Sequence, residues 1–399
     1  MTSVDFETVV VGGGPAGATA ADDLARRGHK VALVDRAGRI KPCGGAVPPR
    51  LLKDFDIPLS LLVARATSAR MIAPSGKAVG MPVGNGFVGL VDRDQFDEWL
   101  RERARASGAE RIAATFEGLE RAPDGTATLL LRPKGAPRGS APTRVRARTV
   151  IGADGANSAV ARAGLPSEKA PPFVAAYHEV IESPPEGFDG FEGQRCDVFY
   201  QGDLSPDFYA WVFPHGPMSS VGVGSARKGF PLREAVAELR ARTGLDRCRT
   251  VRVEGAPIPL KPRKRWDNGR DLVVAGDAAG VVAPASGEGI YYAMTAGRYA
   301  ADAVHAALET GDSRALATAR KRFMKEHGRV FWILGIMQHF WYSSDKRRER
   351  FVKICEDPDV QYLTWEAYMH KKLVRARPAA HARIFFKDLG HLIGSAVAR

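Results

Sequence analysis

The fold is decided near the start of the chain, where residues 8–35 read TVVVGGGPAGATAADDLARRGHKVALVD. The β-branched run at residues 8–11 predicts a short buried strand. The alanine-rich stretch at residues 16–27 is followed by a glycine, which predicts a helix with a glycine cap. A second apolar run, residues 31–34, then ends in Asp35. We therefore predict that one strand–helix–strand unit opens the protein.

The turn between this strand and helix carries the pattern G-x-G-x-x-G, at Gly12, Gly14 and Gly17. Because these residues lack side chains, a pyrophosphate can reach the backbone N–H groups at the helix N-terminus, where the helix dipole favours negative charge. Asp35 lies 18 positions after Gly17, where a carboxylate can accept hydrogen bonds from two ribose hydroxyls. An acid here favours the unphosphorylated ribose of FAD or NAD over that of NADP. The predicted contacts are Gly12, Gly14, Pro15, Ala16, Gly17, Asp35 and Arg36.

Distant motifs favour FAD over NAD. Gly276-Asp277 follows a predicted buried strand and resembles the second flavin motif of the glutathione-reductase-type flavoproteins, whose aspartate holds the ribityl chain. Residues 287–290 open another predicted helix, whose N–H groups would face the pyrimidine end of the flavin ring. Ala153-Asp154-Gly155 resembles the Asp-Gly motif of the flavin hydroxylases, and Arg93 either matches an arginine near the flavin in that branch or only begins a helix. The contacts predicted from these motifs are Arg93, Asp154, Gly276, Asp277, Gly287, Gly289 and Ile290.

The chain divides into three predicted parts, and the predicted fold class is α/β with α+β inserts. Residues 1–165 and 266–305 form a discontinuous, Rossmann-like FAD-binding domain of the p-hydroxybenzoate-hydroxylase or glutathione-reductase type. Within it, residues 144–150 alternate basic and apolar side chains, as a half-exposed strand does. Residues 166–265 form an inserted antiparallel or mixed-sheet domain that binds substrate. Residues 306–399 form a helical C-terminal region.

Composition and charge narrow the class of protein. The 399 residues are 45% hydrophobic and 26% charged, which is typical of a globular protein and excludes collagen-like and disordered chains. The net charge is +13, and residues 312–399 alone carry 18 basic and 9 acidic side chains, which favours anionic partners. No nucleic-acid-binding module accompanies this charge, so we predict no nucleic-acid partner. The apolar runs at residues 331–337 and 340–342 form either an interfacial helix on an anionic membrane or a docking helix over the substrate domain.

The cysteines and the N-terminus indicate the compartment. Cys43, Cys196, Cys248 and Cys355 form no C-x-x-C pair and lack zinc-ligand spacing, so we predict reduced thiols and no metal site. An apolar strand follows Met1 almost directly, which leaves no room for a signal peptide. No apolar run reaches the about 18 residues of a membrane-spanning helix. The predicted location is the cytoplasm, with peripheral contact to the inner membrane left open.

Three further segments resemble the geranylgeranyl reductases, in particular the geranylgeranyl diphosphate and bacteriochlorophyll type of phototrophic bacteria. Residues 41–46, Lys-Pro-Cys-Gly-Gly-Ala, match the family's Cys-Gly-Gly loop near the flavin. Residues 206–214 match its aromatic signature P-x-x-Y-x-W-x-F-P, which hydroxylases of the same fold do not share as a block. Residues 284–292 match its helix entry beside the flavin, and the resemblance covers essentially the whole chain. It adds four predicted cofactor contacts, Cys43, Gly44, Gly45 and Ala46.

The resemblance implies an enzyme that reduces the three isolated double bonds of a geranylgeranyl chain to phytyl in bacteriochlorophyll biosynthesis. The chain is carried on bacteriochlorophyll or as the diphosphate. NADPH is the implied reductant, with reduced ferredoxin as an alternative. No second G-x-G-x-x-G is present, so a nicotinamide donor would have to visit a surface groove. Two other functions of related folds remain open, a FAD-dependent aromatic hydroxylase and a non-catalytic isoprenoid carrier.

An isolated, trisubstituted double bond makes specific demands on a reductase. Because such an alkene resists direct hydride attack, we expect a proton to add first and hydride from flavin N5 to follow. The site must exclude water, which would trap the cation, and aromatic faces would stabilise the cation. Tyr209, Trp211 and Phe213 alternate, so in a strand they share one face. That face either lines a prenyl tunnel or packs in an ordinary core.

The proton donor has several candidates. Cys43 either donates the proton or packs against the flavin as an inert thiol. His178 and His215 are possible acids, but their spacing does not distinguish them from ordinary histidines. The predicted catalytic residues are Cys43, Tyr209, Trp211 and Phe213.

Overall fold

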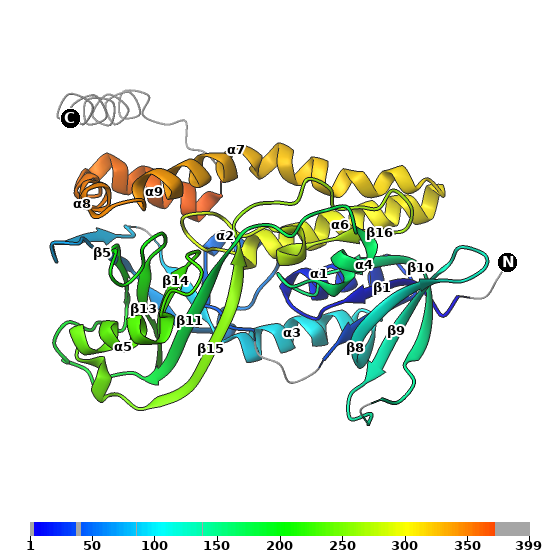
Figure 1. The fold of residues 1–399 in the computed structure, drawn as a ribbon, viewed down its shortest axis with the longest axis horizontal. Helices are drawn as coiled ribbons and strands as arrows, with labels where there is room; N and C mark the ends of the chain where they lie inside the picture. Colours follow the sequence, from blue (N-terminus) through cyan, green and yellow to red (C-terminus); the bar gives the residue numbers. More distant parts are fainter. Residues whose placement is uncertain (1–3, 37–40, 85, 138, 372–399) are drawn as a thin grey trace.

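The structure is a computed structural model that describes residues 4–36, 41–84, 86–137 and 139–371 (Figure 1). Two large β-sheets, of six and seven strands, occupy the two halves of the molecule along its longest axis. A third sheet has three short strands. Helices cover both large sheets.

The six-stranded sheet is built around the predicted strand–helix–strand unit, which is confirmed. Its parallel strands run in the order β8-β2-β1-β10-β16. β1 pairs with β2 on one side and with β10 on the other, so the strand order reverses at β1. Ligands of open α/β sheets bind at such a reversal, beyond the carboxyl ends of the strands. The elements are β1 (Phe6–Val11), α1 (Pro15–Ala25), β2 (Val31–Asp35), β8 (Glu110–Arg121), β10 (Thr143–Gly152) and β16 (Leu272–Val274).

Strand β9 (Ala127–Pro133) pairs antiparallel with both β8 and β10. β8 and β10 therefore extend beyond the parallel sheet. The strand predicted at residues 144–150 lies within β10 and is confirmed.

The seven-stranded sheet has the order β15-β11-β14-β13-β12-β5-β6. All of its pairs are antiparallel except β12 with β5. Residues 68–82 belong to this sheet although the predicted division places them with the FAD-binding domain, because β5 hydrogen-bonds along the edge of β12. Its strands are β5 (Ser68–Ile72), β6 (Ala78–Pro82), β11 (Phe173–Glu182), β12 (Arg195–Phe199), β13 (Ala210–His215), β14 (Met218–Ser225) and β15 (Thr250–Pro259). The small sheet contains β3 (Ala46–Val47), β4 (Leu62–Ala66) and β7 (Val88–Val91).

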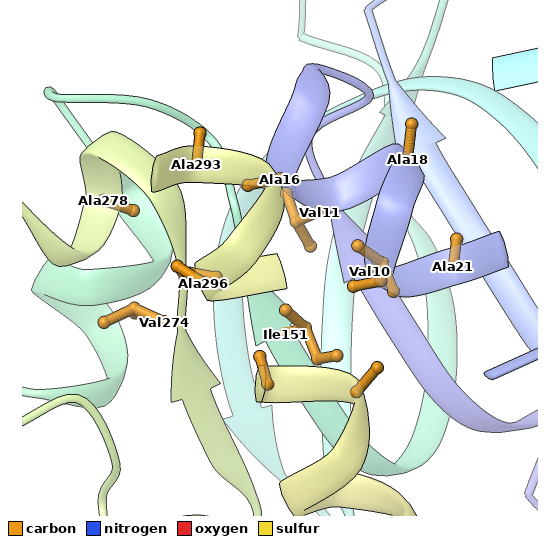
Figure 2. Close-up of a cluster of buried hydrophobic side chains, with 14 of the residues drawn as sticks. Val10, Val11, Ala16, Ala18, Ala21, Ile151, Val274, Ala278, Ala293 and Ala296 are labelled. Carbon is orange, nitrogen blue, oxygen red and sulfur yellow. The ribbon is translucent and has the colours of Figure 1, made fainter. Parts of the chain in front are cut away.

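Helices α1 and α6 pack closely over the first sheet, and small side chains make this possible. Ala16, Ala293 and Ala296 lie with Val11 and Val274 in one buried cluster (Figure 2). At residue 297, a Cβ atom would lie 2.1 Å from the carbonyl oxygen of residue 16, so this position of α6 must be a glycine. The other helices and turns before the C-terminal region are α2 (Pro49–Asp54), η1 (Leu59–Leu61), α3 (Arg93–Ala106), α4 (Ala159–Gly164), α5 (Leu232–Arg242), η2 (Leu245–Arg247), η3 (Gly276–Ala279), α6 (Ile290–Thr310) and η4 (Ser313–Ala317).

The C-terminal region is helical, as predicted, up to His370, and residues 372–399 lie outside the described ranges. Its helices are α7 (Thr318–Trp341), α8 (Asp345–Ile354) and α9 (Pro358–His370). They run along one long side of the molecule (Figure 1). Tyr342, Val352 and Cys355 pack into the same buried cluster as Tyr209 and Trp211 of the seven-stranded sheet. In the described part of the chain, no helix combines the length and the hydrophobicity needed to cross a bilayer.

Candidate active site

The three glycine-containing motifs that lie far apart in the sequence meet at one edge of the first sheet. They follow β1, β10 and β16, whose carboxyl ends point to the same side because the strands are parallel. A Cβ atom at Gly12 would lie 2.3 Å from the carbonyl oxygen of Ala153. A Cβ atom at Gly276 would lie 2.7 Å from the Cβ atom of Ala16. The glycines therefore allow the three turns to pack together.

Gly17 and Gly14 have different local roles in the first turn. A Cβ atom at Gly17 would lie 1.8 Å from the carbonyl oxygen of Gly12, so Gly17 is required for the turn to meet helix α1. A Cβ atom at Gly14 would meet no heavy atom of the described chain within 4 Å. Gly14 is the N-cap of α1, and the open space beside it lies where a helix N-terminus attracts a phosphate.

Asp35 and Arg101 flank this turn. The Oδ2 atom of Asp35 accepts a hydrogen bond of 2.8 Å from the Gly13 N–H, and the neighbouring Arg36 is exposed. Arg101 donates from Nη1 to the Gly13 carbonyl oxygen at 3.2 Å. Arg101 was not among the predicted contacts, although it lies two turns after Arg93 on helix α3 and is 7% exposed.

Asp154 uses its carboxylate to cap a helix. Its Oδ2 atom accepts hydrogen bonds from the N–H groups of Ala159 (2.6 Å) and Val160 (3.1 Å) at the start of α4. Its Oδ1 atom accepts from the Ser158 hydroxyl. The flavin contact predicted for Asp154 stays a prediction beside this structural role.

The motifs after β16 place two buried acids near the start of α6. Asp277 forms an ion pair with Lys41, a residue to which the sequence analysis assigned no role. Glu288 forms a buried ion pair with Lys371, at the end of α9. Burial raises the pKa of Glu288, and the charge of Lys371 opposes this shift. Helix α6 begins at Ile290, as the sequence predicts.

A cavity of about 710 Å³ lies next to these motifs. Its walls come from three parts of the chain: the motifs predicted to bind the nucleotide, the seven-stranded sheet and helices α7–α9. Among the predicted site residues, those that line it are Pro15, Cys43, Gly44, Gly45, Ala46, Arg93, Tyr209, Trp211, Phe213, Asp277, Gly287, Gly289 and Ile290. The remaining predicted contacts, all within the described ranges, lie outside the cavity lining: Gly12, Gly14, Ala16, Gly17, Asp35, Arg36, Asp154 and Gly276. This division suits an extended ligand with one end on the glycine turn and the other at the cavity.

Tyr209, Trp211 and Phe213 line the cavity from one face of the sheet. Their ring centroids are 5.9 Å and 6.2 Å apart in succession. Trp211 donates from Nε1 to the Ser220 hydroxyl at 3.1 Å. Burial raises the pKa of the Tyr209 phenol, whose hydroxyl donates to the Ser286 carbonyl oxygen at 2.6 Å. The polar atoms of Trp211 and Tyr209 are thus satisfied, and their ring faces remain for the cavity.

Glycine at position 222 makes this row of rings possible. A Cβ atom at Gly222, on the neighbouring strand β14, would lie 2.2 Å from the Trp211 ring. The Gly222-x-Gly224 pattern of the sequence therefore provides space for an aromatic side chain.

Cys43 lies at the cavity with Arg93. The Cys43 sulfur accepts from the Gly45 N–H at 3.4 Å. Arg93 is buried and interacts with both Asp97 and Cys43: burial lowers the pKa of Arg93, but the charges of Asp97 and Cys43 outweigh it and the net shift is upward. Arg93 therefore stays a cation beside the Cys43 sulfur.

The two histidines considered as acids have other partners. His178 Nδ1 is 2.9 Å from the Ser220 hydroxyl, and Nε2 is 2.9 Å from Glu254 Oε2. His215 lies between Asp92 Oδ1 (3.2 Å) and the Gly44 carbonyl oxygen (3.1 Å). His215 thus supports the Cys-Gly-Gly loop, a structural role that no sequence pattern indicated.

Helix α7 presents different residues to its two sides. Leu334, Met337 and Trp341 line the cavity. Trp332 and Ile336 point outward and are 67% and 50% exposed. The helix therefore covers the site, which is one of the two roles that the sequence left open, and also carries an exposed apolar surface.

Known proteins resemble this chain over nearly its full length. Residues 6–102 match the family described as pyridine nucleotide-disulphide oxidoreductase. The chain is 54% identical to a geranylgeranyl diphosphate reductase from Rhodobacter capsulatus, and the match covers 98% of each chain. It is 34% identical to the chloroplastic geranylgeranyl diphosphate reductase of Oryza sativa subsp. japonica, over 99% of this chain and 88% of the rice protein.

A solved structure from Thermoplasma acidophilum shares the fold. That protein is described as geranylgeranyl bacteriochlorophyll reductase-like, and it superposes with a TM-score of 0.79 at 23% identity, over 93% of this chain and 98% of the other. At this identity the likeness concerns the fold, and the predicted fold class is confirmed.

Proposed function

Because the chain belongs to the geranylgeranyl diphosphate reductase family and is thus an oxidoreductase, we propose that it binds FAD and saturates the three isolated double bonds of a geranylgeranyl chain. The observation that carries this proposal is that flavin-motif residues and the aromatic row line one cavity of about 710 Å³. A prenyl chain in this space would lie beside a flavin ring held by those motifs. The proposed substrate is geranylgeranyl-bacteriochlorophyll or geranylgeranyl diphosphate, in bacteriochlorophyll biosynthesis.

The residues of the nucleotide side fit FAD. Gly14 leaves open space at the N-terminus of α1 for the pyrophosphate. Asp35 would hold the ribose and Asp277 the ribityl chain. The N-terminus of α6, after Gly289, would stabilise negative charge at the pyrimidine end of the ring. When bound, the reduced flavin supplies hydride to the double bond.

The protein's own groups would handle the proton and the positive charge. The Cys43 thiol gives its proton to one alkene carbon, and Arg93 stabilises the resulting thiolate. The other alkene carbon becomes cationic, and the faces of Tyr209, Trp211 and Phe213 stabilise it until hydride arrives. The apolar walls exclude water that would otherwise trap the cation. Each cycle adds one proton and one hydride, and the thiolate regains its proton from solvent.

The electron donor and the reaction are tested in one assay. We propose NADPH as the reductant, with reduced ferredoxin as the alternative. The protein is incubated anaerobically with NADPH and with either geranylgeranyl diphosphate or geranylgeranyl-bacteriochlorophyll. The masses of the products are then measured by mass spectrometry. Successive gains of two hydrogen atoms are expected. In a parallel aerobic incubation, oxygen consumption in step with NADPH and substrate would identify a hydroxylase. A colourless prenyl-binding protein would identify a carrier. Either result would contradict the proposal.

Trp211→Leu should slow alkene reduction without loss of flavin. A cation–π contact contributes about 0.5–2 kcal/mol, so we expect turnover to fall roughly 2- to 30-fold. Ser220 keeps its hydrogen bond to His178 in the variant, which limits the structural damage. Turnover and flavin absorbance are measured together, with Phe173→Leu as the control, since the Phe173 ring on β11 is 51% exposed and lies outside the cavity lining. Wild-type turnover in Trp211→Leu would show that the aromatic row does not stabilise the cation.

We also propose that the outer side of α7 contacts an anionic membrane, which would suit a lipid-dissolved substrate. Lys325, Arg329, Trp332 and Ile336 recur every three or four residues and are all exposed, so they share one face of the helix. Burial of a large apolar side chain in the membrane contributes about 1.5–3 kcal/mol to the free energy of binding.

The double substitution Trp332→Ser with Ile336→Ser should therefore weaken binding to anionic vesicles at least about 10-fold. Co-sedimentation with phosphatidylserine-containing vesicles measures the effect, and Val253→Ser on β15, where the side chain is 56% exposed, is the control. Equal binding of the double variant and the control would assign the membrane contact to another surface. A wild-type protein that stays in the supernatant would contradict the contact itself.

A further inference from the structure

Away from the cavity, the structure brings together three metal-ligating side chains from distant parts of the sequence. His29 precedes β2, and His305 and Glu309 lie in the last two turns of α6. Ligand atoms of the three side chains all lie within 4.8 Å of one another. We propose that this His–His–Glu cluster binds a divalent transition-metal ion of the zinc class, which would tie the end of α6 to the strand–helix–strand unit.

The ligand set suits zinc. Zinc commonly takes two imidazole nitrogens and one carboxylate oxygen, with a further position for water. His305 and Glu309 are four residues apart on a helix and therefore share one face. His29 Nε2 is 2.8 Å from His305 Nδ1. Two nitrogens on one tetrahedral zinc are roughly 3.3 Å apart, so the rings need to separate by only about 0.5 Å.

His29 is already oriented as a ligand. Its Nδ1 atom is 3.4 Å from Glu7 Oε2, and the same oxygen accepts the Lys30 N–H at 3.1 Å. Histidines that bind metals usually donate their second ring N–H to a carboxylate in this way, which fixes the tautomer. With Nδ1 protonated, the lone pair of Nε2 faces His305. His29 is also largely buried, at 9% exposed.

The charges around the cluster favour a cation. The C-terminal carbonyl groups of α6 carry partial negative charge. The arginines of this region have acidic partners: Arg27 pairs with Asp302, and Arg148 pairs with Glu7. Cysteine spacing predicted no metal site, and no local pattern links His29 to His305, which are 276 positions apart.

Zinc titration of the untagged, chelator-treated and flavin-loaded protein tests the proposal. Calorimetry should show about one bound ion per chain, and zinc should raise the midpoint of thermal unfolding. His29→Ala and His305→Ala should each weaken zinc binding at least about 10-fold, and Glu7→Gln about 10-fold. Glu309→Gln should weaken it as well, and Glu309 is exposed, so this variant is expected to fold normally.

The control is His339→Ala, which removes an exposed histidine from α7 and should leave zinc binding unchanged. None of the cluster residues lines the cavity, so flavin absorbance should be unchanged in every variant. Absence of zinc binding to the wild-type protein would overturn the proposal and leave a hydrogen-bonded histidine pair. Zinc binding as tight as that of the wild-type protein in both His29→Ala and His305→Ala would overturn the proposal too, because the ion would then lie elsewhere.

Discussion

Gly14→Val should give a folded protein that no longer retains FAD. A Cβ atom at Gly14 meets no heavy atom of the described chain within 4 Å, and the φ and ψ angles of −77° and −176° are open to valine. The fold should therefore tolerate the substitution. The new side chain would instead occupy the space proposed for the pyrophosphate at the N-terminus of α1. Hydrogen bonds to charged groups contribute about 1.5–3 kcal/mol each, so we expect FAD affinity to fall about 100-fold or more.

The absorbance of the purified protein and a titration of the apoprotein with FAD measure this effect. Gly193→Val is the matched control, since Gly193 lies in an exposed loop and its Cβ atom would also meet open space. This control should stay yellow. Gly17→Val would be less informative, because its Cβ atom would lie 1.8 Å from the Gly12 carbonyl oxygen and would disrupt the turn itself. Wild-type FAD affinity in a folded Gly14→Val protein would show that the pyrophosphate does not bind here.

Cys43→Ala should nearly abolish alkene reduction while FAD still binds and is still reduced. General acid catalysis typically contributes a factor of about 10² to 10⁴ in rate, and alanine cannot donate a proton. The rate of flavin reduction by NADPH and the rate of alkene reduction are measured separately under anaerobic conditions. Only the second rate should fall. Cys43→Ser should recover part of the activity, because a hydroxyl can relay a proton.

Cys196→Ala provides the matched control for this experiment. Cys196 also lines the cavity, but burial raises the pKa of its thiol to about 12, and its neighbour Asp197 adds to the shift. The Cys196 proton is therefore held more tightly than that of an ordinary thiol. The Cys196→Ala substitution should change the rate of alkene reduction little. Normal alkene reduction by Cys43→Ala, with full flavin content, would show that another group donates the proton.

Local patterns in the sequence were sufficient to predict several elements. Residues 8–35 form β1, α1 and β2 as predicted, and α6 begins at Ile290, the last of the residues 287–290 that were predicted to open this helix. Glycine turns and apolar periodicity act through neighbours a few residues away. Their structural effect can therefore be predicted without knowledge of distant parts of the chain.

Side-chain partners at the site were less predictable. Arg101 contacts the Gly13 carbonyl oxygen, Lys41 pairs with Asp277, and Asp154 caps α4. Arg101 and Lys41 have no distinctive sequence context, and an aspartate after a strand can either cap a helix or bind a ligand. Which partner such a charged side chain takes depends on the elements that pack around it.

The sequence by itself determined the opening strand–helix–strand unit, the order of the glycine-containing motifs along the chain and the alternation that places three aromatic rings on one face. Only the tertiary structure decided that β5 and β6 join the second sheet, that α7–α9 form one wall of the cavity, and that His29 meets His305. The physical reason is the range of the interactions. Turn geometry and periodicity are local properties of the backbone, whereas the wall of a cavity depends on how apolar faces far apart in the sequence pack together.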